Sequence, residues 1–305
     1  PTASLRSMEI AEALMSRADW DAELTVAGSP LQQSWDYGQA AAALGARVRR
    51  FEIDARGPRG FAQVVTRRVG PLDLSALHRG PVWAGSVDTD TARAAVRGLA
   101  AKTKGILIVT PSEWFSGWGL IRLVAPRTEA VIDLSPDLLS LRAGLRGKWR
   151  NRLVRAEAAG LTISTCQPGF QDLRPLIAHE AEQRRTRRYG GLPPAFLRAW
   201  TEVAPDQALL VQATDRTGLV AAMLFLTHGR AATYQLGWTS ERGRRAHAHN
   251  ALLWSGMAQL RARKITSVNL GVTDTEQNPG LARFKLGTGA VARRLRRDDL
   301  RRADR

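Results

Sequence analysis

The segment from Asn269 to Ala290 holds the residues best suited to chemistry in this sequence. Glycines at positions 271, 280, 287 and 289 frame it, and glycine permits tight turns and close approach of a ligand to the backbone. Between them stand Phe284 and Lys285. Only five of the 45 basic residues are lysine, so a lysine here suggests a need for a compact ammonium group. Composition alone does not decide between that role and an incidental lysine.

Other catalytic patterns are missing from the sequence. It has no Gly-x-Ser-x-Gly elbow and no Walker loop. No histidine stands in a metal-ligand pattern with cysteine or carboxylate, so we predict no metal site; the five are His78, His179, His228, His247 and His249. The single cysteine, Cys166, cannot form an internal disulfide, the apolar runs are too short to cross a bilayer, and no signal peptide is visible. We therefore expect a cytoplasmic protein.

The net charge of +17 favours a polyanionic partner. Nucleic acid, a phosphorylated precursor or peripheral contact with an anionic membrane surface would each fit. The opposing interpretation is that the arginine excess reflects only a GC-rich genome and that these side chains form solvated surface. One segment concentrates the charge: apolar residues recur at helical spacing from Leu138 to Ala156, and six cations occupy the other faces. Ser135, Pro136 and Asp137 suit the start of this helix, and Gly160 suits its end.

The elements around these motifs alternate between helices and strands. The first 30 residues read as irregular, and the rest mixes antiparallel strand pairs with helices in a similar order in both halves. Helices are predicted at 31–44, 89–101, 135–159, 172–188, 194–203 and 244–262, and strands at 47–53, 61–69, 106–109, 121–124, 129–132, 161–165, 208–213, 219–227, 231–236 and 267–270. The segment from 271 to 290 reads as glycine-punctuated loop, followed by a basic tail.

Four segments resemble the Fem-type aminoacyltransferases, which move amino acids from aminoacyl-tRNA onto peptidoglycan precursors. Asn269–Ala290, with Leu-Gly, Pro-Gly and Phe-Lys-x-Gly-x-Gly, is similar to the C-terminal signature of that family. Leu31–Gly45 resembles its opening helix, and Lys148–Gly160 resembles its basic helix. Tyr234–Trp238 with Ala248–Trp254 resembles its central strand and long helix. Together the four span most of the chain.

The resemblance implies an α/β fold of two acetyltransferase-like (GNAT-type) domains with mixed sheets flanked by helices. We place an irregular segment at 1–30, the first domain at 31–160, the second, with the active-site motif, at 161–290, and a basic tail at 291–305 that could pack back on the first domain. The resemblance puts Lys285 at the active site beside Phe284. We expect substrate contacts from Trp35, Tyr37, Arg188, Tyr189, Tyr234, Trp238, Asn250 and Gly287, and tRNA or phosphate contacts from Arg142, Arg146, Lys148, Arg150, Arg242 and Arg244.

The implied activity is transfer of an amino acid from aminoacyl-tRNA to an amine of a peptidoglycan precursor or another peptide-like acceptor, without a bound cofactor. Two departures leave the acceptor open. The run Ala40–Ala43 replaces a lysine that often contacts precursor phosphates, and 160–171 is too short for the helical hairpin of some members. One alternative is an acyl-CoA-dependent N-acyltransferase, although Arg242–Ala248 is a poor match to its glycine loop. The other is a non-catalytic nucleic-acid-binding protein.

Overall fold

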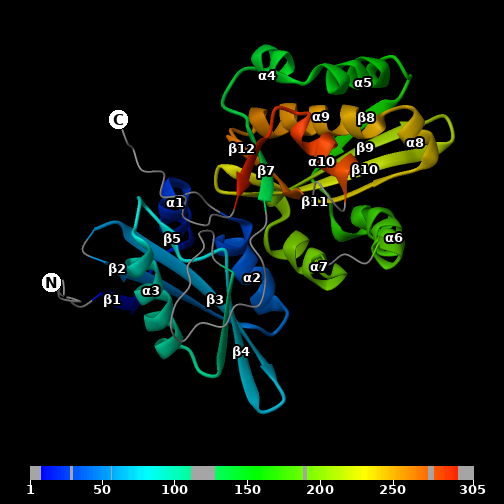
Figure 1. The fold of residues 1–305 in the computed structure, drawn as a ribbon. Helices are drawn as coiled ribbons and strands as arrows, with labels where there is room; N and C mark the ends of the chain where they lie inside the picture. Colours follow the sequence, from blue (N-terminus) through cyan, green and yellow to red (C-terminus); the bar gives the residue numbers. More distant parts are fainter. Residues whose placement is uncertain are drawn as a thin grey trace, which may run out of the picture. The chain divides into compact units, whose positions relative to one another are not determined.

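The computed structural model describes residues 8–27, 30–55, 57–110, 128–187, 191–273 and 278–294. The chain divides into two compact units, with the described residues up to Thr110 in the first and those from Thr128 to Arg293 in the second. Both units are mixed sheets flanked by helices (Figure 1). Among the described residues, no helix is long and apolar enough to span a membrane.

The first unit is built on a six-stranded sheet in the order β1-β2-β3-β4-β6, with β5 paired to β3. All neighbours are antiparallel except β4 and β6, which run parallel. The strands are β1 (Glu9–Glu12), β2 (Arg47–Asp54), β3 (Arg59–Val69), β4 (Leu72–His78), β5 (Val82–Trp83) and β6 (Ile106–Thr110). The helices are α1 (Arg17–Ala27), a 3-10 turn (Leu31–Gln33), α2 (Trp35–Ala43) and α3 (Thr89–Lys102).

Both faces of this sheet are covered, which explains why β3 is buried nearly throughout its first half. Ala62 belongs to a core cluster with Leu99 of α3, whereas its neighbour Phe61 packs with Trp20 and Leu24 of α1. Successive strand residues point to opposite faces, so adjacent apolar residues can serve two cores. The alternating burial expected for a strand with one solvated face is therefore absent from this stretch.

A buried glutamine joins the 3-10 turn to the sheet. The Gln33 side chain accepts a hydrogen bond from the Gln63 amide (2.6 Å) and donates to the carbonyls of Gln63 (3.2 Å) and His78 (2.6 Å). The indole of Trp20 donates to the Gln33 carbonyl (2.9 Å). These contacts place the following helix, α2, at a fixed position on the sheet.

The second unit contains a seven-stranded sheet in the order β13-β7-β12-β11-β10-β9-β8. Its strands are β7 (Thr128–Asp133), β8 (Thr162–Cys166), β9 (Ala208–Asp215), β10 (Gly218–His228), β11 (Ala231–Thr239), β12 (Ser267–Thr273) and β13 (Val291–Arg294). Its helices are α4 (Leu138–Gly144), α5 (Gly147–Glu157), α6 (Phe170–Arg187), α7 (Pro194–Val203), α8 (Glu241–Arg245), α9 (Ala248–Ala262) and α10 (Pro279–Leu286), with a 3-10 turn at Pro205–Gln207. The main core lies between the sheet and α4, α5 and α9.

The division between the units differs from the predicted boundary at Gly160. β7 pairs with β12, and Trp149 and Leu153 of α5 join the core of the second unit. Residues 128–160 therefore belong to that unit, because their apolar faces are buried there. Val291–Arg294 is its edge strand rather than the start of a tail, and 295–305 lie outside the described residues.

Several predicted elements also need correction. Residues 1–30 are not wholly irregular, since they contain β1 and α1, and the predicted strand at 121–124 lies outside the described residues. The long basic helix is interrupted at Leu145 and Arg146, both of which have extended backbone. Its first part is capped by Asp137, which accepts a hydrogen bond from the Ser140 amide (2.8 Å), rather than by Ser135. The predicted helix 244–262 is interrupted at His247, which has a left-handed backbone (φ 51°).

Candidate active site in the second unit

The sheet of the second unit opens between its two central parallel strands. β11 and β12 are in register only from Ala231–Thr233 to Ser267–Asn269, although β11 continues to Thr239 and β12 to Thr273. The neighbouring pair β10–β11 has a register shift beside Phe225. Beyond the paired residues the main chains of β11 and β12 are not bonded to each other, so a ligand could reach their polar groups there.

Lys285 lies at this opening, on α10. The helix begins with Pro279 in its first turn and ends at Gly287, so residues that resembled loop punctuation are the start and end signals of a helix. Lys285 lines a small, closely packed cavity that has no space for a water molecule; its other lining residues are Met223, Tyr234, Leu253, Leu270 and Phe284. Its side chain is 6% exposed, and its ammonium donates to the Val272 carbonyl (2.8 Å).

Burial lowers the pKa of Lys285 to about 8, and the nearby Glu129 carboxylate opposes that effect. Glu129 lies on β7 and is itself 7% exposed. It accepts a hydrogen bond from the Asn269 amide group (2.9 Å), and the Asn269 side chain accepts from the Gly271 amide (2.7 Å). A Cβ at Gly271 would lie 3.6 Å from the Lys285 ammonium. The ammonium therefore stands among oriented polar groups with little water near it.

α5 packs against the Phe284–Lys285 pair and positions it. The Trp149 indole donates to the Phe284 carbonyl (3.0 Å), and the two rings lie 6.1 Å apart. Gly287 faces the same indole, because a Cβ there would lie 2.7 Å from Trp149. Gly287 thus allows this packing, and its predicted contact with substrate stays a prediction. The sequence pattern places Trp149 among the apolar residues that recur from Leu138 to Ala156 and gives no sign of this hydrogen bond.

Two predicted substrate-binding residues, Tyr234 and Trp238, lie on the part of β11 that does not pair with β12, and a third, Asn250, lies on α9. Tyr234 lines the cavity, and its hydroxyl lies so close to Gly237 that a side chain at 237 would collide with it. Trp238 stacks on His179 of α6 with ring centroids 3.8 Å apart. Asn250, in the first turn of α9, is 5% exposed, and its Nδ2 has no hydrogen-bond partner among the described residues. Arg188 and Tyr189 lie outside those residues.

A further polar residue at this site was missed by sequence reasoning. The Nε2 of His249 donates to the Trp238 carbonyl (3.0 Å), and its ring lies 6.1 Å from that of Phe284. Burial lowers the pKa of His249, and the Arg244 cation contributes in the same direction. A neutral imidazole next to Phe284 is therefore expected at neutral pH. The sequence gave no sign of this contact, because the contact depends on where β11 lies in the fold.

The predicted basic residues fall into two groups. Arg142, Arg242 and Arg244 pair with the carboxylates of Glu157 (2.7 Å), Asp215 (3.0 Å) and Glu241 (2.8 Å), so part of their charge is neutralised. The other group is exposed on the second unit and has no carboxylate partner within the described ranges; its members are Arg146, Lys148 and Arg150. The second group is better suited to contact a polyanion.

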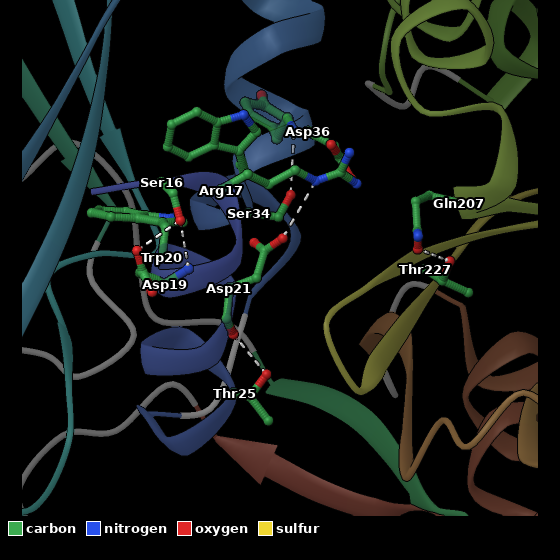
Figure 2. A network of polar contacts seen from close by, with 12 residues as sticks. Ser16, Arg17, Asp19, Trp20, Asp21, Thr25, Ser34, Asp36, Gln207 and Thr227 are labelled. Atoms are coloured by element: carbon green, nitrogen blue, oxygen red, sulfur yellow. Dashed lines mark hydrogen bonds and ion pairs between the residues drawn. The ribbon is translucent and has the colours of Figure 1, made fainter. Parts of the chain in front are cut away.

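The remaining predicted substrate-binding residues, Trp35 and Tyr37, open α2 in the first unit. The Arg50 guanidinium stacks over the Trp35 ring at 3.6 Å, and burial lowers the pKa of Arg50 to about 10. Burial also raises the pKa of the Tyr37 hydroxyl. Between them in the chain, Asp36 is buried and bonds to Arg17 (2.8 Å), as Figure 2 shows. This polar cluster orients α2 within its own unit.

No group of three or more metal-binding side chains occurs in the part of the chain that the structure describes. The structure thus offers Lys285 as a buried cation, oriented amides and carbonyls beside it, and an apolar lining. Such a site can stabilise a developing oxyanion by electrostatics, since donors fixed in a dry environment act more strongly than in water.

Comparison with known proteins extends this description. A family model described as an acetyltransferase (GNAT) domain matches residues 142–286. No curated protein sequence is detectably similar to the chain. The solved structure of FemX is similar over 94% of this chain and 96% of its own length, with a TM-score of 0.71 and 14% identity.

Two other solved structures, each 14% identical, have the same overall fold. A conserved protein of unknown function from Bacteroides thetaiotaomicron matches 93% of this chain and 96% of its own, with a TM-score of 0.55. A tandem GNAT protein from the clavulanic acid biosynthesis pathway matches 94% and 96%, with a TM-score of 0.51. The predicted resemblance is therefore confirmed in the fold: the chain consists of two acetyltransferase-like units.

Proposed function

We propose that this protein is an aminoacyltransferase that moves an amino acid from aminoacyl-tRNA to the amine of a peptidoglycan precursor or another peptide-like acceptor. The observation that carries the proposal is the buried Lys285 ammonium at the opening between β11 and β12. The GNAT domain match supports acyl transfer as the reaction class. The resemblance of four segments to Fem-type enzymes supports aminoacyl-tRNA as the donor.

In this proposal the acceptor amine attacks the ester carbonyl of aminoacyl-tRNA. A carbon–nitrogen bond forms, the ester carbon–oxygen bond breaks, and the ribose hydroxyl of the tRNA leaves with the proton that the amine loses. Negative charge develops on the carbonyl oxygen, and Lys285 stabilises it as a fixed cation. Phe284 and Tyr234 exclude water, while Trp149 holds α10 in place through the Phe284 carbonyl. An ester already activated on tRNA requires chiefly positioning beyond this.

The acyl-CoA alternative is less well supported by the segment that follows β11. A pyrophosphate needs free amides at a helix N-terminus, usually presented by glycines. In this chain the segment forms α8, whose Ser240 cap accepts a hydrogen bond from the Gly243 amide (3.1 Å). A Cβ at Gly243 would lie 2.5 Å from the Val220 carbonyl oxygen, so that glycine is required for packing on β10. Arg245 and His247 occupy positions where glycine amides would be needed.

Incubating the purified protein with pools of charged tRNA and cell extract tests the donor. Mass spectrometry should detect an acceptor that gains one aminoacyl residue, and prior deacylation of the tRNA should abolish the product. Acetyl-CoA should neither replace charged tRNA nor raise Tm. A ligand at a hundredfold excess over its Kd stabilises by roughly 2.7 kcal/mol, which a thermal shift assay detects easily. A clear shift with acetyl-CoA, together with acetylated product, would favour the alternative donor.

A further inference from the structure

One end of the sheet in the first unit exposes aliphatic side chains. Val69 and Leu72 flank the Gly70-Pro71 turn of the β3–β4 hairpin and are 60% and 56% exposed. Ile106, at the start of the neighbouring strand β6, is 55% exposed. β6 pairs with β4 so that Ile106 lies opposite Leu74, two residues beyond Leu72. Figure 1 shows this hairpin extending from its sheet. Water-exposed aliphatic groups on a projecting turn are not explained by packing within the unit.

A basic cavity lies at the same end. Its volume is about 590 Å³, and it is lined by Gly45, Arg47, Thr66, Arg68, Pro71, Leu72, Asp73, Lys104 and Gly105. Three of these residues are cations and one is a carboxylate, so the lining has a net charge of +2 (three minus one). Asp73 is engaged with Arg47 at 2.8 Å, and Arg68 and Lys104 have no carboxylate partner within the described residues. The cavity therefore suits an anionic group.

The backbone fixes the cations around this cavity. Arg47 of β2 lies opposite Thr66 of β3, and Arg68 of β3 lies opposite Asp73 of β4, so both pairs belong to one sheet. Gly105 has φ 75°, and a Cβ there would lie 2.0 Å from the Asp73 carbonyl oxygen. Only glycine fits this close approach, which brings the preceding residue, Lys104, against β4. The Thr66 and Ser75 hydroxyls, 2.8 Å apart, are buried between the two strands.

We propose that this end of the unit docks on an anionic phospholipid bilayer. The docking surface consists of Arg47, Arg68, Val69, Leu72, Lys104 and Ile106. The aliphatic side chains enter the interfacial region, and the basic cavity receives a headgroup phosphate. Aliphatic residues combined with a cationic rim are typical of interfacial membrane binding, in which burial of apolar area and attraction to anionic lipid act together. Single-stranded nucleic acid would instead favour aromatic stacking residues, and none lines the cavity.

Vesicle flotation tests this proposal without any tRNA or acceptor, so its result is independent of the proposed transferase activity. The full chain should float with vesicles of phosphatidylcholine and phosphatidylglycerol and should stay unbound with phosphatidylcholine alone. The Val69→Ser/Leu72→Ser double variant should lose binding about a hundredfold, at roughly tenfold for each aliphatic side chain. The Arg68→Gln/Lys104→Gln variant should lose about 25-fold, at roughly fivefold for each cation. Arg47 is kept so that Asp73 retains its partner.

Matched controls lie on the second unit. Leu139→Ser/Val154→Ser removes two aliphatic groups that are 83% and 51% exposed, and Arg216→Gln/Lys264→Gln removes two exposed cations. Both controls should bind vesicles like the unmodified protein, and circular dichroism melting should show that every variant is folded. Vesicle binding that ignores phosphatidylglycerol, or that survives both docking-surface variants, overturns the proposal. Loss of bulk tRNA binding in the Arg68/Lys104 variant with unchanged vesicle binding would assign the cavity to RNA instead.

Discussion

Replacing Lys285 by methionine separates catalysis from stability more clearly than any other change in the candidate site. The side chain is almost fully buried, and its pKa is lowered from 10.5 to about 8. Because a shift of one pKa unit corresponds to 1.36 kcal/mol, the folded state binds this proton less tightly than the unfolded state by about 3 kcal/mol. Methionine has a similar length and removes that desolvation cost. It also removes the hydrogen bond to the Val272 carbonyl, worth about 1.5–3 kcal/mol for a charged donor.

At neutral pH these two effects nearly cancel, so Lys285→Met should change the free energy of unfolding by no more than about 1–2 kcal/mol. The single-turnover rate should nevertheless fall about a hundredfold to a thousandfold, because the fixed cation beside the oxyanion is gone. Arginine should restore little activity, since its broad planar head cannot replace a compact ammonium. If the ammonium form is required, the rate of the unmodified protein should decline as pH rises through about 8.

The pH dependence of stability gives an independent check. Between about pH 8 and 10.5 the unfolded chain keeps the Lys285 proton and the folded protein has lost it, so stability rises with pH. The difference in unfolding free energy between the unmodified protein and Lys285→Met should therefore shift by about 3 kcal/mol across this window, in favour of the unmodified protein. Urea titrations at several pH values measure it, with exposed Lys264→Met as the control. A constant difference, or an unchanged turnover rate, would refute the reasoning.

Three further changes test other parts of the structure. Neutralising Arg146 and Arg150 with glutamine should weaken tRNA binding and reduce its log–log salt slope by about two, and an unchanged slope would make α5 a solvated face. Gln33→Ala should lower the unfolding free energy by about 2–4 kcal/mol, because it leaves buried groups unpaired. Denaturant titration measures this loss, which would be smaller if a water molecule replaced the amide. Gly237→Ala should cost about 1–3 kcal/mol through collision with the Tyr234 hydroxyl, and adding Tyr234→Phe should recover part of that loss.

Much of the second unit follows from local sequence patterns. β10 is a long apolar run buried on both faces, and β9 and β11 flank it with short turns, so their strand assignment needed no tertiary information. The break at Leu145 was not predictable in the same way. The Arg146 amide donates to the Gly287 carbonyl (2.9 Å), and that contact replaces a helical hydrogen bond with one across the fold.

Of the candidate site, only the residues that are adjacent in the sequence could be predicted. The Phe284–Lys285 pair stood out from its composition and from its resemblance to a known signature. Glu129 did not, because its contact with Asn269 joins residues 140 positions apart. The punctuation around α10 was misread as loop, since Pro279 and Gly287 mark turns as readily as helix ends. The burial of Lys285 could not be predicted from the sequence either, because it arises from strands and helices that come together only in the folded unit.

The pairing of β7 with β12 has a consequence for synthesis of the protein. The strand of Asp133 cannot pair until Ser267 has been synthesised, and the edge strand β13 is synthesised later still. At roughly 5–20 residues per second, about 7–27 s pass between the two partners leaving the ribosome. During that interval the apolar face of β7 lacks its neighbour, and chaperones have time to bind it. A nascent chain truncated before β12 should therefore remain protease-sensitive in its second unit, whatever the state of the first.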